Sequence, residues 1–273
     1  MIFDDTQCAL GEGPLWHPLR GELFWFDILG KRLQSKARQW QFDEYVSAAG
    51  WVNADILLIA SQTALIRFDL RDGSQTPLCP LEADSPHTRS NDGRADPQGG
   101  FWIGTMGINA EPGAGAIYRY FKGELRQLFA PVTISNAICF APDGKTAYFT
   151  DTPTQKIMRV ALDADGWPQG DPVLHIDLRA TDLRPDGAVV DAQGNLWNAQ
   201  WGAGRVAGYA PDGTFIDSYS FAATQTSCPA FGGDDLSTLF CTSAATGLDG
   251  PDQGRTYATP TPYKGQAEHQ VLL

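Results

Sequence analysis

The sequence predicts a closed six-bladed β-propeller, with four-stranded antiparallel blades around a central channel and a single domain over residues 1–273. Two observations predict it. Short apolar runs rich in Val, Ile and aromatic residues alternate with turns that contain Gly, Pro or Asp, which is typical of strands. A unit of apolar strand, turn and aromatic strand also recurs about every 42 residues, the length of a four-stranded blade. At that spacing the chain holds six blades.

The repeated unit can be followed in order along the chain. Its clear copies and one fainter copy lie at 14–21, 93–99, 137–144, 188–194 and 229–233. The long gap between the first two leaves room for a weak unit near 51–56. Because a propeller must hide the strand edges where its ring closes, we expect the N-terminal strand to complete the last blade. An open stack of β-meanders or a sandwich is the alternative architecture.

Composition limits the partners that the protein is expected to have. The 20 Lys and Arg stand against 32 Asp and Glu, a formal charge of −12, so no basic surface for nucleic acid or an anionic membrane is expected. The acidic start Met1–Asp5 lacks the pattern of a secretory signal, and no long apolar segment follows. The five cysteines form no C-x-x-C pair, which favours reduced thiols. We therefore expect a cytoplasmic protein, and a monomer.

Four polar residues stand eight or nine positions before the turn glycines, where each innermost strand should begin. They are Glu12, Asn91, Asn136 and Asp186. Equivalent positions of different blades converge on the central axis, so two carboxylates and two amides are expected in one small space. A divalent cation would offset the repulsion between the carboxylates. An all-oxygen site favours Ca²⁺, Mg²⁺ or Mn²⁺, and Zn²⁺ or Fe²⁺ can bind where open positions remain.

The alternative is that each of these residues is ordinary turn chemistry, since Asn and Asp commonly cap their own backbone. Their equivalent positions in four repeats favour the metal site. Asp163–Gly166 resembles the start of a calcium loop, but Leu174 stands where that loop needs a bidentate Glu, so we interpret it as a turn.

Five ordered motifs resemble those of the sugar-lactonase propellers, the family that includes regucalcin, gluconolactonases and bacterial pentonolactonases. They run from residue 10 to about residue 250: Leu10–Trp16, Ser90–Gly93 with Gly104–Met106, Ile134–Asn136, Pro185–Gly187 with Leu196–Trp197, and Thr226–Cys228 with Phe231–Gly233. The resemblance implies a six-bladed propeller with a metal held by Glu12, Asn136 and Asp186. It also implies that Arg89 and Asn91 contact the substrate.

One segment departs from the family pattern. Animal members have two acids after the Gly-Thr-Met motif, one of which touches substrate, whereas Gly107, Ile108 and Asn109 follow it here. We keep Asn109 as a candidate substrate contact, and the animal-type substrate preference is open. The segment 107–115 lacks a strand pattern and is expected to be a loop over the pocket or a plain linker.

The predicted activity is metal-dependent hydrolysis of a sugar lactone to its aldonic acid. The cation would polarise the carbonyl, Asp186 would bind the cation and accept a proton from water, and Arg89 would orient the substrate. An organophosphate or aryl-ester hydrolase of the same propeller type is one alternative, and a noncatalytic calcium-binding or interaction propeller is another. Trp16, Trp102 and Trp197 are expected to pack between blades, and the role of Trp201 is open.

Overall fold

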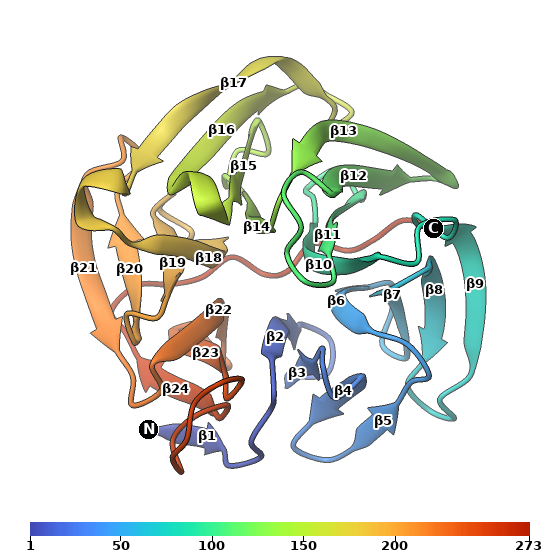
Figure 1. Cartoon of the computed structure of the whole chain (residues 1–273), viewed down its shortest axis with the longest axis horizontal. Coiled ribbons are helices and arrows are strands. Elements are labelled where there is room, and N and C mark those ends of the chain that lie inside the picture. The colour runs from blue at the N-terminus through green and yellow to red at the C-terminus, as the bar shows by residue number, and fades with distance from the viewer.

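The computed structural model describes all residues, 1–273, and forms six four-stranded antiparallel sheets arranged in a ring (Figure 1). The sheets are blades of a propeller, as predicted. The first three contain β2 (Gly11–His17), β3 (Glu22–Asp27), β4 (Arg32–Ser35) and β5 (Gln39–Gln41); β6 (Val46–Trp51), β7 (Ile56–Ser61), β8 (Ala64–Asp69) and β9 (Gln75–Pro80); and β10 (Thr88–Ala95), β11 (Phe101–Gly107), β12 (Gly115–Phe121) and β13 (Glu124–Val132).

The other three blades continue the same order. They contain β14 (Ser135–Phe140), β15 (Thr146–Asp151), β16 (Lys156–Leu162) and β17 (Pro168–Asp177); β18 (Arg184–Val190), β19 (Leu196–Trp201), β20 (Arg205–Tyr209) and β21 (Phe215–Ser220); and β22 (Gln225–Gly232), β23 (Thr238–Ala244), β24 (Thr256–Pro260) and β1 (Ile2–Asp4). The two helices, η1 (Thr152–Thr154) and η2 (Arg179–Thr181), are single 3-10 turns, and no helix is long and apolar enough to cross a membrane.

The ring closes as the sequence predicts, because β1 supplies the outermost strand of the last blade. Ile2 pairs with Tyr257 and Asp4 with Thr256, and the N-terminal amino group donates to the Ala258 carbonyl (2.8 Å). The last blade thus combines the first strand of the chain with its last three strands. All four of its positions are filled by this chain.

Apolar side chains fill the space between neighbouring blades. Trp102 and Trp197 are fully buried in two of these clusters, and the half-buried Trp16 stacks on Phe240 with ring centroids 5.6 Å apart. The prediction that these three tryptophans pack between blades is confirmed. None of them lies on the cavity described below.

The recurrent turn that revealed the repeat has a defined hydrogen-bonding role. Asp191 Oδ1 accepts from the backbone amides of Gln193 and Asn195, both at 2.9 Å. Asp96 makes the same two bonds with the amides two and four residues ahead. An aspartate that holds its own turn in this way fixes the hairpin between the first and second strands.

Every innermost strand has a bulge near its start. The pairing register shifts between Glu12 and Leu15 in β2, between Asn136 and Cys139 in β14, and at corresponding places in β6, β10, β18 and β22. A bulge turns side chains away from the regular alternation of a strand. It therefore sets the direction of the polar side chains at the channel mouth.

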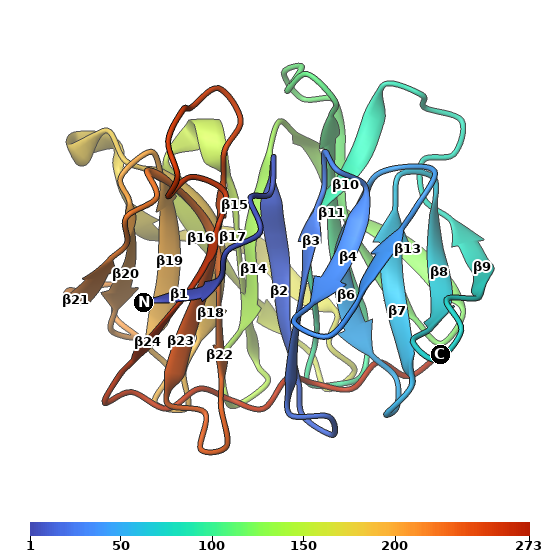
Figure 2. The ribbon, with the colours of Figure 1, turned by 90° about the horizontal axis from the view of Figure 1, so that it is seen from below.

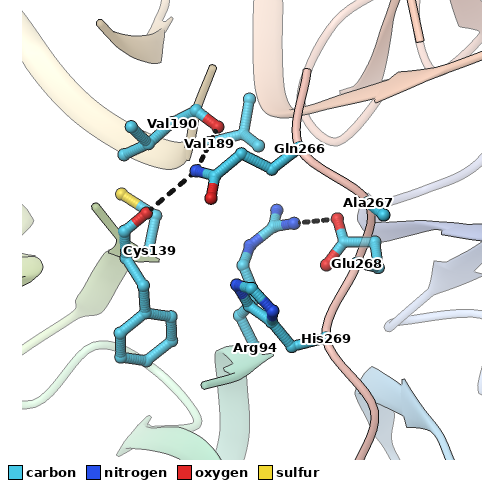
Figure 3. Close-up of a pocket in the computed structure, with 9 residues that line it drawn as sticks. Arg94, Cys139, Val189, Val190, Gln266, Ala267, Glu268 and His269 are labelled. Carbon is cyan, nitrogen blue, oxygen red and sulfur yellow. Dashed lines mark hydrogen bonds and ion pairs between the residues drawn. The ribbon is translucent and has the colours of Figure 1, made fainter. Parts of the chain in front are cut away.

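The C-terminal segment after β24 crosses the opposite end of the channel (Figures 1 and 2). Gln266 Nε2 donates to the carbonyls of Phe140 (3.2 Å) and Val190 (3.0 Å), and the Leu272 amide donates to the Gly99 carbonyl (2.8 Å). Arg94 from β10 pairs with Glu268, as Figure 3 shows. A cavity of only about 20 Å³ remains beside this pair, room for roughly one water molecule.

Candidate active site

A cavity of about 300 Å³ opens at the end of the channel where the innermost strands begin. Five residues predicted for the site line it: Glu12, Arg89, Asn91, Asn136 and Asp186. The structure therefore brings together side chains from four blades, as the repeat predicts. The remaining lining residues come from the ends of first and second strands and from the loops beside them: Leu10, Leu29, Met106, Ile108, Ile134, Thr152, Arg184, Trp201 and Thr246.

Two carboxyl groups, Glu12 on β2 and Asp186 on β18, are buried in this cavity, and neither forms an ion pair. Burial, with the nearby Asp92 charge, raises the pKa of Glu12 to about 8, although the Gly13 amide donates to Glu12 Oε2 (3.0 Å). Burial and the charge of Glu12 raise the pKa of Asp186 well above its usual range. Ionisation of both carboxyl groups is therefore unfavourable unless a positive charge binds beside them.

A chain of hydrogen bonds connects the amides. Arg89 Nη1 donates to Asn91 Oδ1 (2.7 Å), and Asn91 Nδ2 donates to Asn136 Oδ1 (3.0 Å). Asn136 Nδ2 donates to Thr152 Oγ1 (2.9 Å), which in turn donates to the Pro185 carbonyl (2.8 Å). The chain runs from the third blade to the strand that holds Asp186, so it fixes the amide orientations and connects three blades at the cavity.

Arg89 is the buried one of the two cationic side chains that line the cavity, the other being the exposed Arg184. It is only 5% exposed, and burial lowers its pKa to about 10, while the charges of Glu12 and Asp186 act in the opposite direction. The group is still protonated at neutral pH. Arg89 thus supplies one positive charge and fixed donors beside two carboxyl groups, but forms no ion pair with either.

Sequence reasoning missed Asp92 and Thr152. Asp92 is buried, burial raises its pKa to about 6, and its Oδ2 accepts from the Ile138 amide (2.7 Å). Its charge raises the pKa of both cavity carboxyl groups. The only indication in the sequence was its position next to Asn91. Because Asp92 precedes Gly93, the pair was interpreted as a turn. Thr152 follows a strand with no distinguishing motif.

The donor set fits a divalent cation. No three His, Cys, Asp or Glu side chains lie close enough together to hold a metal ion. The predicted site, however, consists of two carboxylates and one amide oxygen, all hard donors of the kind that Ca²⁺, Mg²⁺ and Mn²⁺ prefer. Two buried carboxyl groups without an ion-pair partner are the structural feature that such a charge would compensate.

The structure does not bring Asn109 into the cavity. This residue is exposed, and its Nδ2 donates to Glu111 Oε1 (3.0 Å) in the loop between β11 and β12. From this loop, Ile108 reaches the cavity lining instead. The loop therefore contributes an apolar contact at the mouth, and the substrate contact predicted for Asn109 stays a prediction without support from the cavity geometry. Trp201 does line the cavity, half-buried.

Comparison with known proteins gives concordant findings. Residues 10–245 match the model of the SMP-30/Gluconolactonase/LRE-like region. L-arabinolactonase of Azospirillum brasilense is 36% identical over 97% of this chain and 93% of its own, and 6-deoxy-6-sulfogluconolactonase of Pseudomonas putida is 33% identical over 95% and 94%. The crystal structure of regucalcin from Agrobacterium tumefaciens, described as a calcium-binding protein, superposes with a TM-score of 0.97 at 42% identity, covering 100% of this chain and 97% of that one.

Proposed function

Because the chain belongs to the SMP-30/gluconolactonase/LRE-like family, we propose that it is a metal-dependent hydrolase that opens a sugar lactone to the corresponding aldonic acid. Relatives named as lactonases, matched over nearly their whole length, support lactone hydrolysis. One observation of the structure carries the metal dependence: Glu12 and Asp186 are buried in one cavity without an ion-pair partner, beside the Asn136 amide.

Glu12, Asn136 and Asp186 would hold the cation. Lewis-acid polarisation of the lactone carbonyl is the chemistry that a divalent cation supplies in such a site. Hydrogen bonds at both ends fix the Asn136 amide, because its oxygen accepts from Asn91 Nδ2 and its nitrogen donates to Thr152 Oγ1. The ligand orientation is therefore set before any substrate binds.

Asp186 is the candidate proton acceptor. In the reaction the oxygen of water adds to the carbonyl carbon, the bond from that carbon to the ring oxygen breaks, and a proton ends on the released hydroxyl. As an ionised carboxylate that lines the cavity, Asp186 would take the proton from water and return it to the ring oxygen. Arg89 would orient the lactone through its charge and its fixed donors.

The test is lactone turnover by chelated protein restored with one cation at a time, for the wild type and Asp186→Asn. Loss of a ligand worth ~4 kcal/mol in the transition state lowers the rate about a thousandfold. Asp143→Asn, in an exposed turn, is the matched control and should keep full activity. Full turnover by the metal-free protein would contradict metal dependence.

The same assay separates the alternatives. It should include an aryl ester and a paraoxon-like phosphate ester beside aldonolactones. A higher kcat/KM for either ester would favour an organophosphate or aryl-ester hydrolase. Cation binding without turnover of any substrate would favour a noncatalytic calcium-binding propeller.

A further inference from the structure

A second cavity of about 400 Å³ adjoins the candidate active site. Ile134, Thr152 and Arg184 line both cavities, so the two are adjacent compartments at the same face of the propeller. The second cavity is completed by Pro153, Gln155 and Asp182. Its lining is therefore mainly polar, in contrast to the apolar rim of the first, and nothing in the hydrolytic chemistry described above uses it.

Arg184 stands at the boundary of the two compartments. It is the first residue of β18 and is exposed, and its side chain makes no hydrogen bond or ion pair. In the antiparallel register it lies opposite Trp201 of β19, which lines the first cavity. A planar donor group and an indole ring thus come from paired positions of neighbouring strands, and both line the first cavity.

The floor of the second cavity is held in a fixed shape. Gln155 Nε2 donates to Asp182 Oδ1 (2.9 Å), which connects the turn after β15 to the turn before β18. Gln155 and Asp182 end η1 and η2, and both have a left-handed backbone, with φ of 55° and 52°. Such a conformation is uncommon for residues other than glycine. The hydrogen bond therefore connects the Gln155 and Asp182 side chains across the second cavity.

Resting on the proposed lactonase function, we propose that this second cavity binds the hydroxylated side arm of the lactone, the carbon chain outside the ring. The lactone ring occupies the first cavity and the arm passes Trp201 and Arg184. The charges of the Arg184 guanidinium and the Asp182 carboxylate cancel. Together with Gln155 these side chains offer hydrogen-bond donors and acceptors, which suit neutral hydroxyl groups. The protein therefore prefers hexonolactones, with a longer arm, to pentonolactones with the same ring.

The experiment compares kcat/KM for D-galactono-1,4-lactone and L-arabinono-1,4-lactone, which share their ring configuration and differ by one hydroxylated carbon in the arm. We expect a ratio of at least about fivefold in favour of the hexonolactone. Loss of one or two hydrogen bonds to the arm should reduce that ratio to about one in Arg184→Ala, and part of the way in Gln155→Ala. Arg159→Ala, an exposed arginine on β16 outside both cavities, is the control and should keep the wild-type ratio.

The outcomes separate the two proposals. If both lactones are hydrolysed with a wild-type ratio near one, or Arg184→Ala keeps the wild-type ratio, the subsite is overturned while the lactonase function stands. If a lactone with a carboxylate at the end of its arm is preferred to the neutral hexonolactone, the proposal that the second cavity binds a neutral arm is wrong. If no lactone is hydrolysed, both proposals fall. Equal unfolding midpoints of the variants and the wild type exclude a folding defect as the cause of a changed ratio.

Discussion

Glu12 and Asp186 are acids whose ionisation is opposed by their surroundings. Both are about 5% exposed; burial and the Asp92 charge raise the pKa of Glu12, and burial and the charges of Glu12 and Asp92 raise the pKa of Asp186. In the metal-free protein at neutral pH, protonation relieves this repulsion, whereas a bound divalent cation would relieve it with both groups ionised. Cation binding is therefore expected to release protons, and to depend on pH.

The metal-free protein should lose stability as pH rises. The pKa of Glu12 is about 8 in the folded state against 4.5 as the ordinary value, so between these pH values the folded chain binds more protons than the unfolded chain. The free energy of unfolding therefore falls with pH across this window, by an amount on the order of a few kcal/mol. Urea unfolding in the presence of a chelator measures it.

Glu12→Gln is the control for this effect, since an amide does not titrate. Its free energy of unfolding should fall less steeply between pH 5 and about 8 than that of the wild type. Identical slopes in the two proteins would show that Glu12 is already ionised in the folded state.

The cavity residues could be predicted from the sequence where the repeat fixed a position, and the family resemblance added Arg89. Glu12, Asn136 and Asp186 occupy equivalent places in their blades, so the ring brings them together. Asn109 lies in a loop outside the repeat, and a loop's path depends on contacts that its own residues do not reveal. Asp92 was missed because an Asp-Gly pair is typical of an exposed turn, so its burial beside the cavity was not expected.

The innermost strands share a bulge, and this element sets the site. In β2 the residue after Glu12 is Gly13, with φ of 52°, and in β14 the residue after Asn136 is Ala137, with φ of 55°. The two blades therefore use the same backbone bend to aim a ligand candidate into the cavity. In the sequence, the glycines beside Glu12 indicated that backbone and ligands approach closely there. Ala137 has the same conformation as Gly13, but nothing in the sequence distinguishes it from a regular strand residue.

Gly13→Ala should damage both stability and activity. An added Cβ would collide with the Ser47 carbonyl oxygen of β6, in a backbone conformation that already disfavours a side chain. Gly21→Ala is the matched control, since its φ is 61° but no atom lies within 4 Å of an added Cβ. We expect about 1 kcal/mol of lost stability for Gly21→Ala, a larger loss for Gly13→Ala, and reduced turnover only for Gly13→Ala.

Equal effects of the two substitutions, measured by urea unfolding and lactone turnover, would contradict this account. They would mean that backbone conformation alone determines the cost, and that contact between the first two blades does not hold Glu12 in place.

At the scale of the whole molecule, the C-terminal segment connects blades that are distant along the ring. The Trp51 indole donates to the Glu268 carbonyl (2.7 Å), the Ala192 amide donates to the Lys264 carbonyl (2.8 Å), and Arg94 pairs with Glu268 inside the channel. The blade count and closure could be predicted because they follow from period and length. The path of this segment could not, since it belongs to no repeat.

Glu268→Gln should destabilise the protein strongly. Arg94 and Glu268 have side chains only 10% and 8% exposed, and removing one partner leaves a buried charge without compensation, at a cost of about 3 kcal/mol or more. The double variant Arg94→Met with Glu268→Gln should recover most of this loss, because no unpaired charge remains. Urea unfolding of the single and double variants tests it, and an unchanged single variant would contradict the importance of the pair.

Because the C-terminal segment crosses the far end of the channel (Figure 2), where Arg94 pairs with Glu268, we expect the candidate reaction to take place in a well that is open at one end. Reactant and product must share one entrance, so the carboxylate that is formed has to leave before another molecule can enter. Turnover is then strictly sequential, and accumulated aldonate is expected to compete with fresh lactone for the vacant well.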